Sequence, residues 1–118
     1  MQNASSTSVR VFWLNREAVM ANLRAAVRQM RATHPEIEEV WLFGSLARDQ
    51  AVPGSDADLL LILTDASEDF LSRIPCYLPQ GLPLDVDVFP YTRAEIETAL
   101  EEGHPFIRQA LAEGVLLS

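Results

Sequence analysis

The chain has 118 residues, of which 48% are apolar, which is enough for one domain with a single hydrophobic core. Its longest purely apolar run, residues 59–63, is far shorter than the roughly 20 residues of a membrane-spanning helix, so no membrane segment is expected. The net charge is −8, and all nine basic residues are arginine. Because proteins that bind nucleic-acid backbones usually carry a basic surface, we do not expect a long nucleic-acid substrate.

The start of the chain differs in composition from the rest. Residues 1–14 are polar and serine-rich at first and lack the charged-then-apolar pattern of a secretory signal, which predicts a flexible N-terminal tail before a domain over residues 15–118. Cys76 is the only cysteine and cannot form an internal disulfide, so we expect a reducing, cytoplasmic location. Its place between Pro75 and Tyr77 favours a buried structural thiol.

Helical and extended segments alternate along the first half of the chain. Apolar residues recur at helical spacing over residues 15–33, and His34-Pro35 ends this helix because a residue before proline is disfavoured in the α region. Residues 40–43 predict a short buried strand, and residues 46–50 a short helix. Residues 58–63 are almost continuously apolar, which predicts a central strand covered on both faces.

The next elements place two carboxylates together. Residues 67–77 are predicted to form a helix with Ser67 as its N-cap. Residues 84–89 alternate between apolar and acidic residues and predict a third strand. Since alternate residues of a strand share a face, Asp85 and Asp87 are expected on the same side of the sheet.

The last segments complete the predicted fold. Thr92 and Glu95 form a capping-box pattern that opens a helix running through Leu100. A short helix around residues 105–112 and an edge strand at 115–117 follow. This alternation predicts an α/β (α+β) fold in which a small mixed sheet is covered by helices.

Asp56 and Asp58 give the first chemical signal. They are two residues apart at the start of a strand, so their side chains are expected to point the same way. Two like charges this close repel each other unless a cation lies between them, and Mg²⁺ prefers carboxylate, water and phosphate oxygens. Taken alone, the pair is more often a turn-capping motif than a metal site.

Two further groups of residues have both a functional and a structural interpretation. Gly44 and Ser45 lie where a strand meets a helix, so their backbone could hold a phosphate or form a plain turn. Arg48, in the first turn of that helix, could reach a triphosphate or pair with a neighbouring acid. Asp85 and Asp87 either add ligands to a metal site or form a solvated polar face.

In combination these residues resemble the DNA polymerase β-like nucleotidyltransferase superfamily, specifically its minimal single-domain members (MNT). The family signature is Gly-Ser, a short helix, Asp-x-Asp and a third Asp on a later strand; here it stands as GSLARDQAVPGSDADLL, followed by LDVDVF. The resemblance covers roughly residues 15–118. Asp49 stands where the family usually has glycine, which places a negative charge near the expected phosphates or reshapes the loop.

The resemblance implies a polymerase β-like fold and a metal-dependent reaction. A nucleoside monophosphate, expected to be AMP, would pass from a nucleoside triphosphate to a hydroxyl acceptor with release of pyrophosphate, assisted by two magnesium ions. We prefer Asp87 to Asp85 as the third carboxylate because it lies between apolar residues just before the strand ends. The implied functional residues are the catalytic magnesium ligands Asp56, Asp58 and Asp87 and the nucleotide-binding residues Gly44, Ser45 and Arg48.

The resemblance also implies a partner. Minimal members of the family are often encoded beside a small helical HEPN-domain protein as a toxin–antitoxin pair, in which the nucleotidyltransferase modifies and silences its partner. An alternative hypothesis is a binding module that neutralises the partner by contact, with weak or no catalysis. The three expected carboxylates favour the enzyme, whereas Asp49 disfavours it. The basic stripe on the first helix, formed by Arg24, Arg28 and Arg31, is either a solvated face or part of a partner interface.

Overall fold

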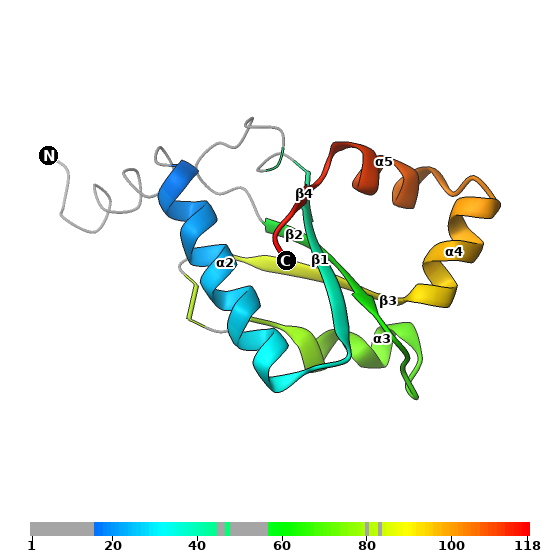
Figure 1. The fold of residues 1–118 in the computed structure, drawn as a ribbon, viewed down its shortest axis with the longest axis horizontal. Coiled ribbons are helices and arrows are strands. Elements are labelled where there is room, and N and C mark those ends of the chain that lie inside the picture. Colours follow the sequence, from blue (N-terminus) through cyan, green and yellow to red (C-terminus); the bar gives the residue numbers. More distant parts are fainter. Residues whose placement is uncertain (1–15, 45–46, 48–56, 80, 83) are drawn as a thin grey trace, which may run out of the picture.

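The computed structural model describes residues 16–44, 47, 57–79, 81, 82 and 84–118. One sheet lies between helix α2 on one face and helices α4 and α5 on the other (Figure 1). This arrangement confirms the predicted mixed sheet covered by helices. The elements are α2 (Arg16–Thr33), β1 (Ile37–Phe43), β2 (Ala57–Leu63), α3 (Phe70–Arg73), the 3₁₀ helix η1 (Ile74–Tyr77), β3 (Val86–Thr92), α4 (Arg93–Glu101), α5 (Pro105–Glu113) and β4 (Val115–Leu116).

Strand β2 is the central strand, as its apolar run predicts. The strand order is β3-β2-β1-β4, with β2 antiparallel to β1 and parallel to β3, and with β4 antiparallel to β1. Residues 59–63 of β2 are all buried. Because successive side chains of a strand point to opposite faces, Leu59 and Leu61 pack toward α2, whereas Leu60 and Ile62 pack toward α4 and α5.

Helix α2 covers its face of the sheet with the apolar stripe expected from its sequence. Its buried residues recur at helical spacing, and they contact the odd-numbered leucines of β2 within one core cluster. Those buried residues are Val19, Met20, Leu23, Val27 and Met30. The predicted bounds of 15–33 agree with the observed Arg16–Thr33.

The segment predicted as one helix over residues 67–77 is instead two short helices. Asp69, not Ser67, caps α3, because its side chain accepts a hydrogen bond from the backbone N–H of Ser72. Pro75 then occupies the start of η1, where its missing N–H is tolerated. In this tighter turn Tyr77 points into the core and Cys76 outward, so the prediction of a buried thiol is wrong.

Strand β3 begins later and ends later than predicted. It runs from Val86 to Thr92, so Asp85 precedes the strand, where its carbonyl accepts a hydrogen bond from the N–H of Ala57 at 2.9 Å. Pro90 has no backbone N–H, but the strand can continue through it because β3 is at the edge of the sheet and has no neighbouring strand on its outer side. The buried Arg73 guanidinium donates to the Pro90 carbonyl at 3.1 Å.

The remaining elements follow the predictions closely. Strand β1 starts at Ile37, three residues earlier than expected, and both hydrogen bonds of the Thr92–Glu95 capping box are present. Helix α5 and the edge strand β4 also form. The predicted tail over residues 1–14 and the predicted helix over 46–50 lie outside the described residues, apart from Ala47. No helix in the described part of the chain combines the length and apolar character needed to cross a bilayer.

Candidate active site

Asp58 and Asp87 lie side by side on neighbouring parallel strands. They are register partners of β2 and β3, and each is the second residue of its strand. Both lie on the face toward α4 and α5, as the burial of Leu60 and Phe89 two residues further along shows. Since neighbouring strands are about 4.8 Å apart, the two carboxylates leave the sheet close together. Asp58 is half-buried and Asp87 is exposed.

Gly44 borders this pair of carboxylates from the end of β1. The preceding residue, Phe43, is the register partner of Asp58. Gly44 has φ = +82°, a left-handed conformation that favours glycine. A Cβ atom at this position would lie 2.6 Å from Oδ2 of Asp58, closer than any normal contact. The absence of a side chain therefore lets the Asp58 carboxylate approach the backbone at the strand end.

The described part of the chain holds three of the predicted site residues. Gly44, Asp58 and Asp87 come together at one end of the sheet. The other predicted residues, Ser45, Arg48 and Asp56, lie outside the described residues. Asp85, the alternative third carboxylate, is exposed just before β3 and is not the register partner of Asp58.

The donor chemistry of this strand end fits a magnesium ion. A cation between Asp58 and Asp87 would offset the repulsion of two neighbouring carboxylates, and oxygen is the donor that Mg²⁺ prefers. Gly44 leaves room beside Oδ2 of Asp58 that a side chain would fill. Among the described residues no group of three or more His, Cys, Asp or Glu side chains is placed to hold a metal. Asp56, the partner of Asp58 in the Asp-x-Asp motif, is expected to be a further ligand and lies outside that search.

Three phenylalanine rings, which we call the aromatic wall, pack beside the carboxylates. Phe43 of β1, Phe89 of β3 and Phe106 of α5 have ring centroids 5.3–5.5 Å apart, and each ring is half-buried. Their tilted and edge-on arrangements are the ones aromatic pairs prefer. Sequence analysis did not find this cluster, because contacts among three separate elements leave no local pattern.

Two arginines form ion pairs at the opposite end of the sheet. Arg93, which follows β3, binds Glu38 and Glu39 at the start of β1, with N–O distances of 2.8 and 2.9 Å. A hydrogen bond from the Trp41 indole N–H lowers the pKa of Glu39, and Arg93 adds to this effect. Arg73 likewise lowers the pKa of Glu95 through paired hydrogen bonds. These contacts anchor the sheet away from the carboxylate pair.

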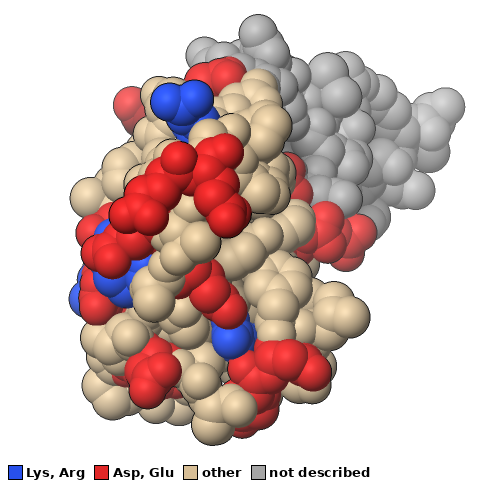
Figure 2. Space-filling view, turned by 90° about the vertical axis from the view of Figure 1, so that its right-hand side faces the viewer, with Lys and Arg blue, Asp and Glu red and all other residues tan. Residues whose placement is uncertain are grey.

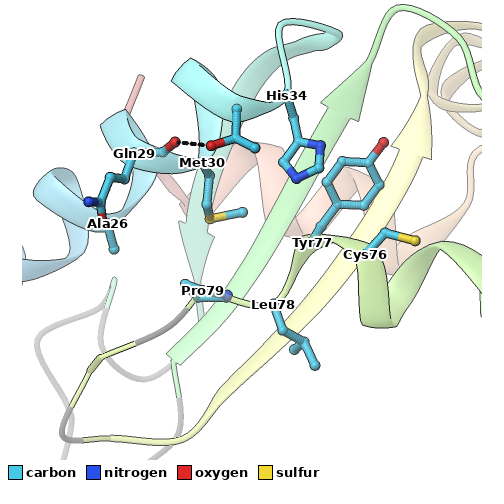
Figure 3. A pocket seen from close by; sticks show the side chains of 9 residues that line it. Ala26, Gln29, Met30, His34, Cys76, Tyr77, Leu78 and Pro79 are labelled. Atoms are coloured by element: carbon cyan, nitrogen blue, oxygen red, sulfur yellow. Dashed lines mark hydrogen bonds between the residues drawn. The ribbon is translucent and has the colours of Figure 1, made fainter.

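A separate cavity of about 240 Å³ lies between α2 and η1, on the other side of the sheet (Figure 3). His34 and Tyr77 face each other there, with ring centroids 4.9 Å apart. The Tyr77 hydroxyl donates to Glu36 at 2.6 Å, and burial raises the pKa of Tyr77, so the phenol stays protonated. These contacts join η1 to the end of α2 and have a structural role.

Comparison with known proteins identifies the family. The profile of the nucleotidyltransferase domain matches residues 20–117. The chain belongs to the nucleotidyltransferase domain family. A crystal structure of a Sulfolobus solfataricus protein, assigned provisionally as a nucleotidyltransferase, is similar in fold, with a TM-score of 0.58. The two are 20% identical over 98% of this chain and 87% of the other. No match was found among curated proteins.

Family membership supports nucleotidyl transfer as the general activity of this nucleotidyltransferase. The matched region contains both strands that carry Asp58 and Asp87, together with Gly44. The broad class inferred from the Gly-Ser and Asp-x-Asp signature is therefore confirmed. The minimal subtype and the HEPN-domain partner stay predictions.

Proposed function

We propose that this nucleotidyltransferase is magnesium-dependent and transfers AMP from a nucleoside triphosphate to a hydroxyl acceptor, releasing pyrophosphate. The observation that carries the proposal is the register pairing of Asp58 with Asp87 beside the Gly44 backbone. The two carboxylates share a strand end and a face, which is the placement needed for common metal ligands. Asp56, two residues before Asp58, completes the proposed set of carboxylate ligands.

Each residue has a distinct proposed role. Asp56, Asp58 and Asp87 would hold the magnesium, which would supply positive charge at the phosphates and lower the pKa of the acceptor hydroxyl. Asp87, the exposed member of the described pair, accepts the hydrogen of that hydroxyl and orients its oxygen toward the α-phosphorus. The backbone at Gly44 and Ser45 holds the outer phosphates, with Arg48 as an additional cation.

The chemical step is an in-line displacement. A bond forms between the acceptor oxygen and the α-phosphorus as the bond from that phosphorus to the bridging oxygen of the β-phosphate breaks. Pyrophosphate leaves with the bonding electrons, and the hydroxyl proton passes to a carboxylate oxygen of Asp87. Gly44, at the end of β1, and Asp87, on β3, lie at either side of β2. A triphosphate held at Gly44 would therefore have its leaving oxygen toward Gly44 and the entering oxygen toward Asp87.

The surface charge argues against a long nucleic acid as the acceptor. Figure 2 shows acidic side chains spread over the side that carries α4 and α5, with few arginines among them. Exposed acids there include Glu97 and Glu101 of α4, and Glu102, which directly follows the helix. Phosphate backbones are repelled by such a surface. On the family resemblance we propose a protein hydroxyl as the acceptor and a HEPN-domain protein as the partner.

Transfer of label from ATP carrying a radioactive α-phosphate tests the proposal. The protein is co-expressed and purified with a candidate HEPN-domain partner, then incubated with magnesium and the labelled ATP. Asp58→Asn and Asp87→Asn should lower transfer to the partner by at least about 100-fold, because metal ions contribute several kcal/mol to such reactions. Asp85→Asn is the matched control and should retain transfer, since Asp85 lies before β3.

Each other outcome has a clear meaning. If Asp85→Asn alone abolishes transfer, the choice of Asp87 as the third carboxylate is wrong. Tight association with the partner but no label, even for the unmodified protein, would favour the binding module over the enzyme.

A second measurement needs no acceptor. Because a ligand that binds only the folded state stabilises it, magnesium should raise the melting temperature of the unmodified protein. Replacing Asp56 and Asp58 by Asn should cancel that rise. A rise of the same size in the double variant would contradict metal binding by these carboxylates.

A further inference from the structure

The aromatic wall is placed where a ligand of the carboxylate pair would meet it. Phe43 is the register partner of Asp58, and Phe89 follows Asp87 by two residues on the same face of β3. Phe43 therefore lies beside Asp58, Phe89 is the next side chain on this face after Asp87, and Phe106 of α5 contacts both rings. Two residues of strand span about 6.6 Å, so Phe89 is within reach of a nucleoside whose phosphate is bound at Asp87.

The rings are not fully enclosed by the core. Leu60 and Ile62, on the same face of the sheet, are 0% and 1% exposed, whereas all three phenylalanines keep part of their surface accessible. An apolar surface that stays partly exposed next to a charged strand end is a feature of binding sites, where one part of a ligand is polar and another is apolar.

The geometry of the proposed reaction indicates which part of the substrate points this way. In an in-line displacement the entering and leaving oxygens define a line through the α-phosphorus, and the nucleoside is attached at right angles to it. Gly44, Asp58 and Asp87 are on β1, β2 and β3, so this line crosses the strands. The nucleoside then extends along the strands or away from the sheet, and the aromatic wall lies in the direction along the strands.

We propose that the aromatic wall formed by Phe43, Phe89 and Phe106 is the nucleoside subsite, against which the base and ribose of the bound triphosphate pack. This inference rests on the proposed function, because it needs the triphosphate at Gly44 and the carboxylates. Stacking on aromatic rings tolerates any base, since every base has a π-face. The subsite therefore adds affinity for a nucleotide over inorganic triphosphate.

The test compares the binding of ATP and of inorganic triphosphate by calorimetry, each with magnesium and without an acceptor. Phe89→Leu and Phe106→Leu remove one ring each from the wall, and Phe89→Tyr restores a ring at the same position. The matched control is Phe70→Leu. Phe70 packs on Tyr91, with ring centroids 4.7 Å apart. Tyr91 is on the same face of β3 as Asp87 but four residues further along the strand, so this contact is outside the aromatic wall.

The unmodified protein should bind ATP more tightly than triphosphate. Each leucine variant of the wall should weaken ATP binding about fivefold or more, which corresponds to the lower end of base stacking, and should leave triphosphate binding unchanged. Phe89→Tyr and Phe70→Leu should bind both compounds as the unmodified protein does. Retained triphosphate binding shows that the leucine variants are folded.

Two results overturn the inference, and they are distinguishable. If triphosphate binds but the wall variants bind ATP as well as the unmodified protein does, or lose both compounds equally, the wall is not the nucleoside subsite and the proposed function stands. If the unmodified protein binds neither compound, the proposed function fails and the nucleoside subsite fails with it.

Discussion

The substitution Gly44→Ala should impair the active site far more than it impairs folding. Gly44 has φ = +82°, a conformation that costs a residue with a side chain about 1–2 kcal/mol. For a domain of this size a loss of about 1 kcal/mol lowers the melting temperature by roughly 3–6 °C. The new Cβ would also lie 2.6 Å from Oδ2 of Asp58. That oxygen is the end of a rotatable side chain, so it can move without a shift of the backbone.

The same movement is large on the scale of metal coordination. An ordinary contact begins at 3.4 Å, so the Asp58 oxygen must retreat from 2.6 Å by about 0.8 Å. Metal–ligand distances hold to within about 0.2 Å, and a misplacement of about 1 Å can cost about 100-fold in rate. We therefore expect Gly44→Ala to lose most of the magnesium-dependent rise in melting temperature and to lower nucleotide transfer about 100-fold.

Gly103→Ala is the matched control for backbone strain. Gly103 has φ = +71°, and its Cβ would meet Nη1 of Arg108 at 3.7 Å, which is an ordinary contact. The two variants should therefore melt at similar temperatures without magnesium, and only Gly44→Ala should lose the response to magnesium and the transfer of labelled AMP. Equal magnesium responses and transfer rates in the two variants would show that the Asp58 carboxylate does not depend on the missing side chain at Gly44.

Three further predictions concern the opposite end of the sheet. Arg73→Met should lower the free energy of unfolding by about 2 kcal/mol in urea titrations, because Arg73 donates to the Pro90 carbonyl and to Glu95 from a buried position; unchanged stability would contradict this role. Arg73 lowers the pKa of Glu95, so the ion pair stabilises the fold above the ordinary carboxyl pKa, and that stability is lost as the pH falls through the lowered value. Glu95→Gln should therefore flatten the acid side of the stability profile, and a profile of unchanged slope would exclude this pair as its cause. Thr92→Ala removes the α4 cap and should cost about 1 kcal/mol in the same titrations, whereas a neutral effect would mean that Glu95 caps the helix alone.

Local patterns account for the elements that sequence analysis placed correctly. Helical spacing of buried residues predicts α2, and the Thr92–Glu95 pattern predicts the first residue of α4. The continuous apolar run of β2 predicts a strand covered on both faces, because only a central strand between two helical layers buries every residue. Each of these signals is contained within one segment of the chain.

The predictions for β3 and α3 were wrong where a contact with a residue distant in the sequence determines the local structure. Pro90 looks like the end of a strand, but β3 continues because it is an edge strand and Arg73 satisfies the Pro90 carbonyl. Ser67 looks like a helix cap, but Asp69 is the residue whose side chain reaches a free N–H. The residues around Pro90 indicate neither that β3 is at the edge of the sheet nor that Arg73 lies beside it.

In the candidate site, too, some features follow from local sequence and others from contacts between distant segments. The spacing of Gly44 and Asp58 within the signature is a property of the sequence, and the family match supports its interpretation. That Asp87 is the direct neighbour of Asp58 depends on the register of two strands separated by a 22-residue connection, from residue 64 to 85. The aromatic wall depends on how α5 packs, so no local pattern predicts it.

The contact between Arg73 and Pro90 also governs what the outer edge of the sheet can do. An exposed edge strand normally offers free N–H and C=O groups to which another strand can add, which is a common route to aggregation. In β3, Pro90 has no N–H to offer, and its carbonyl is already occupied by Arg73. A foreign strand approaching at this point would find neither a donor nor an acceptor. The middle of the edge is thus closed to strand addition, which protects a strand that also carries Asp87 from being drawn into an intermolecular sheet.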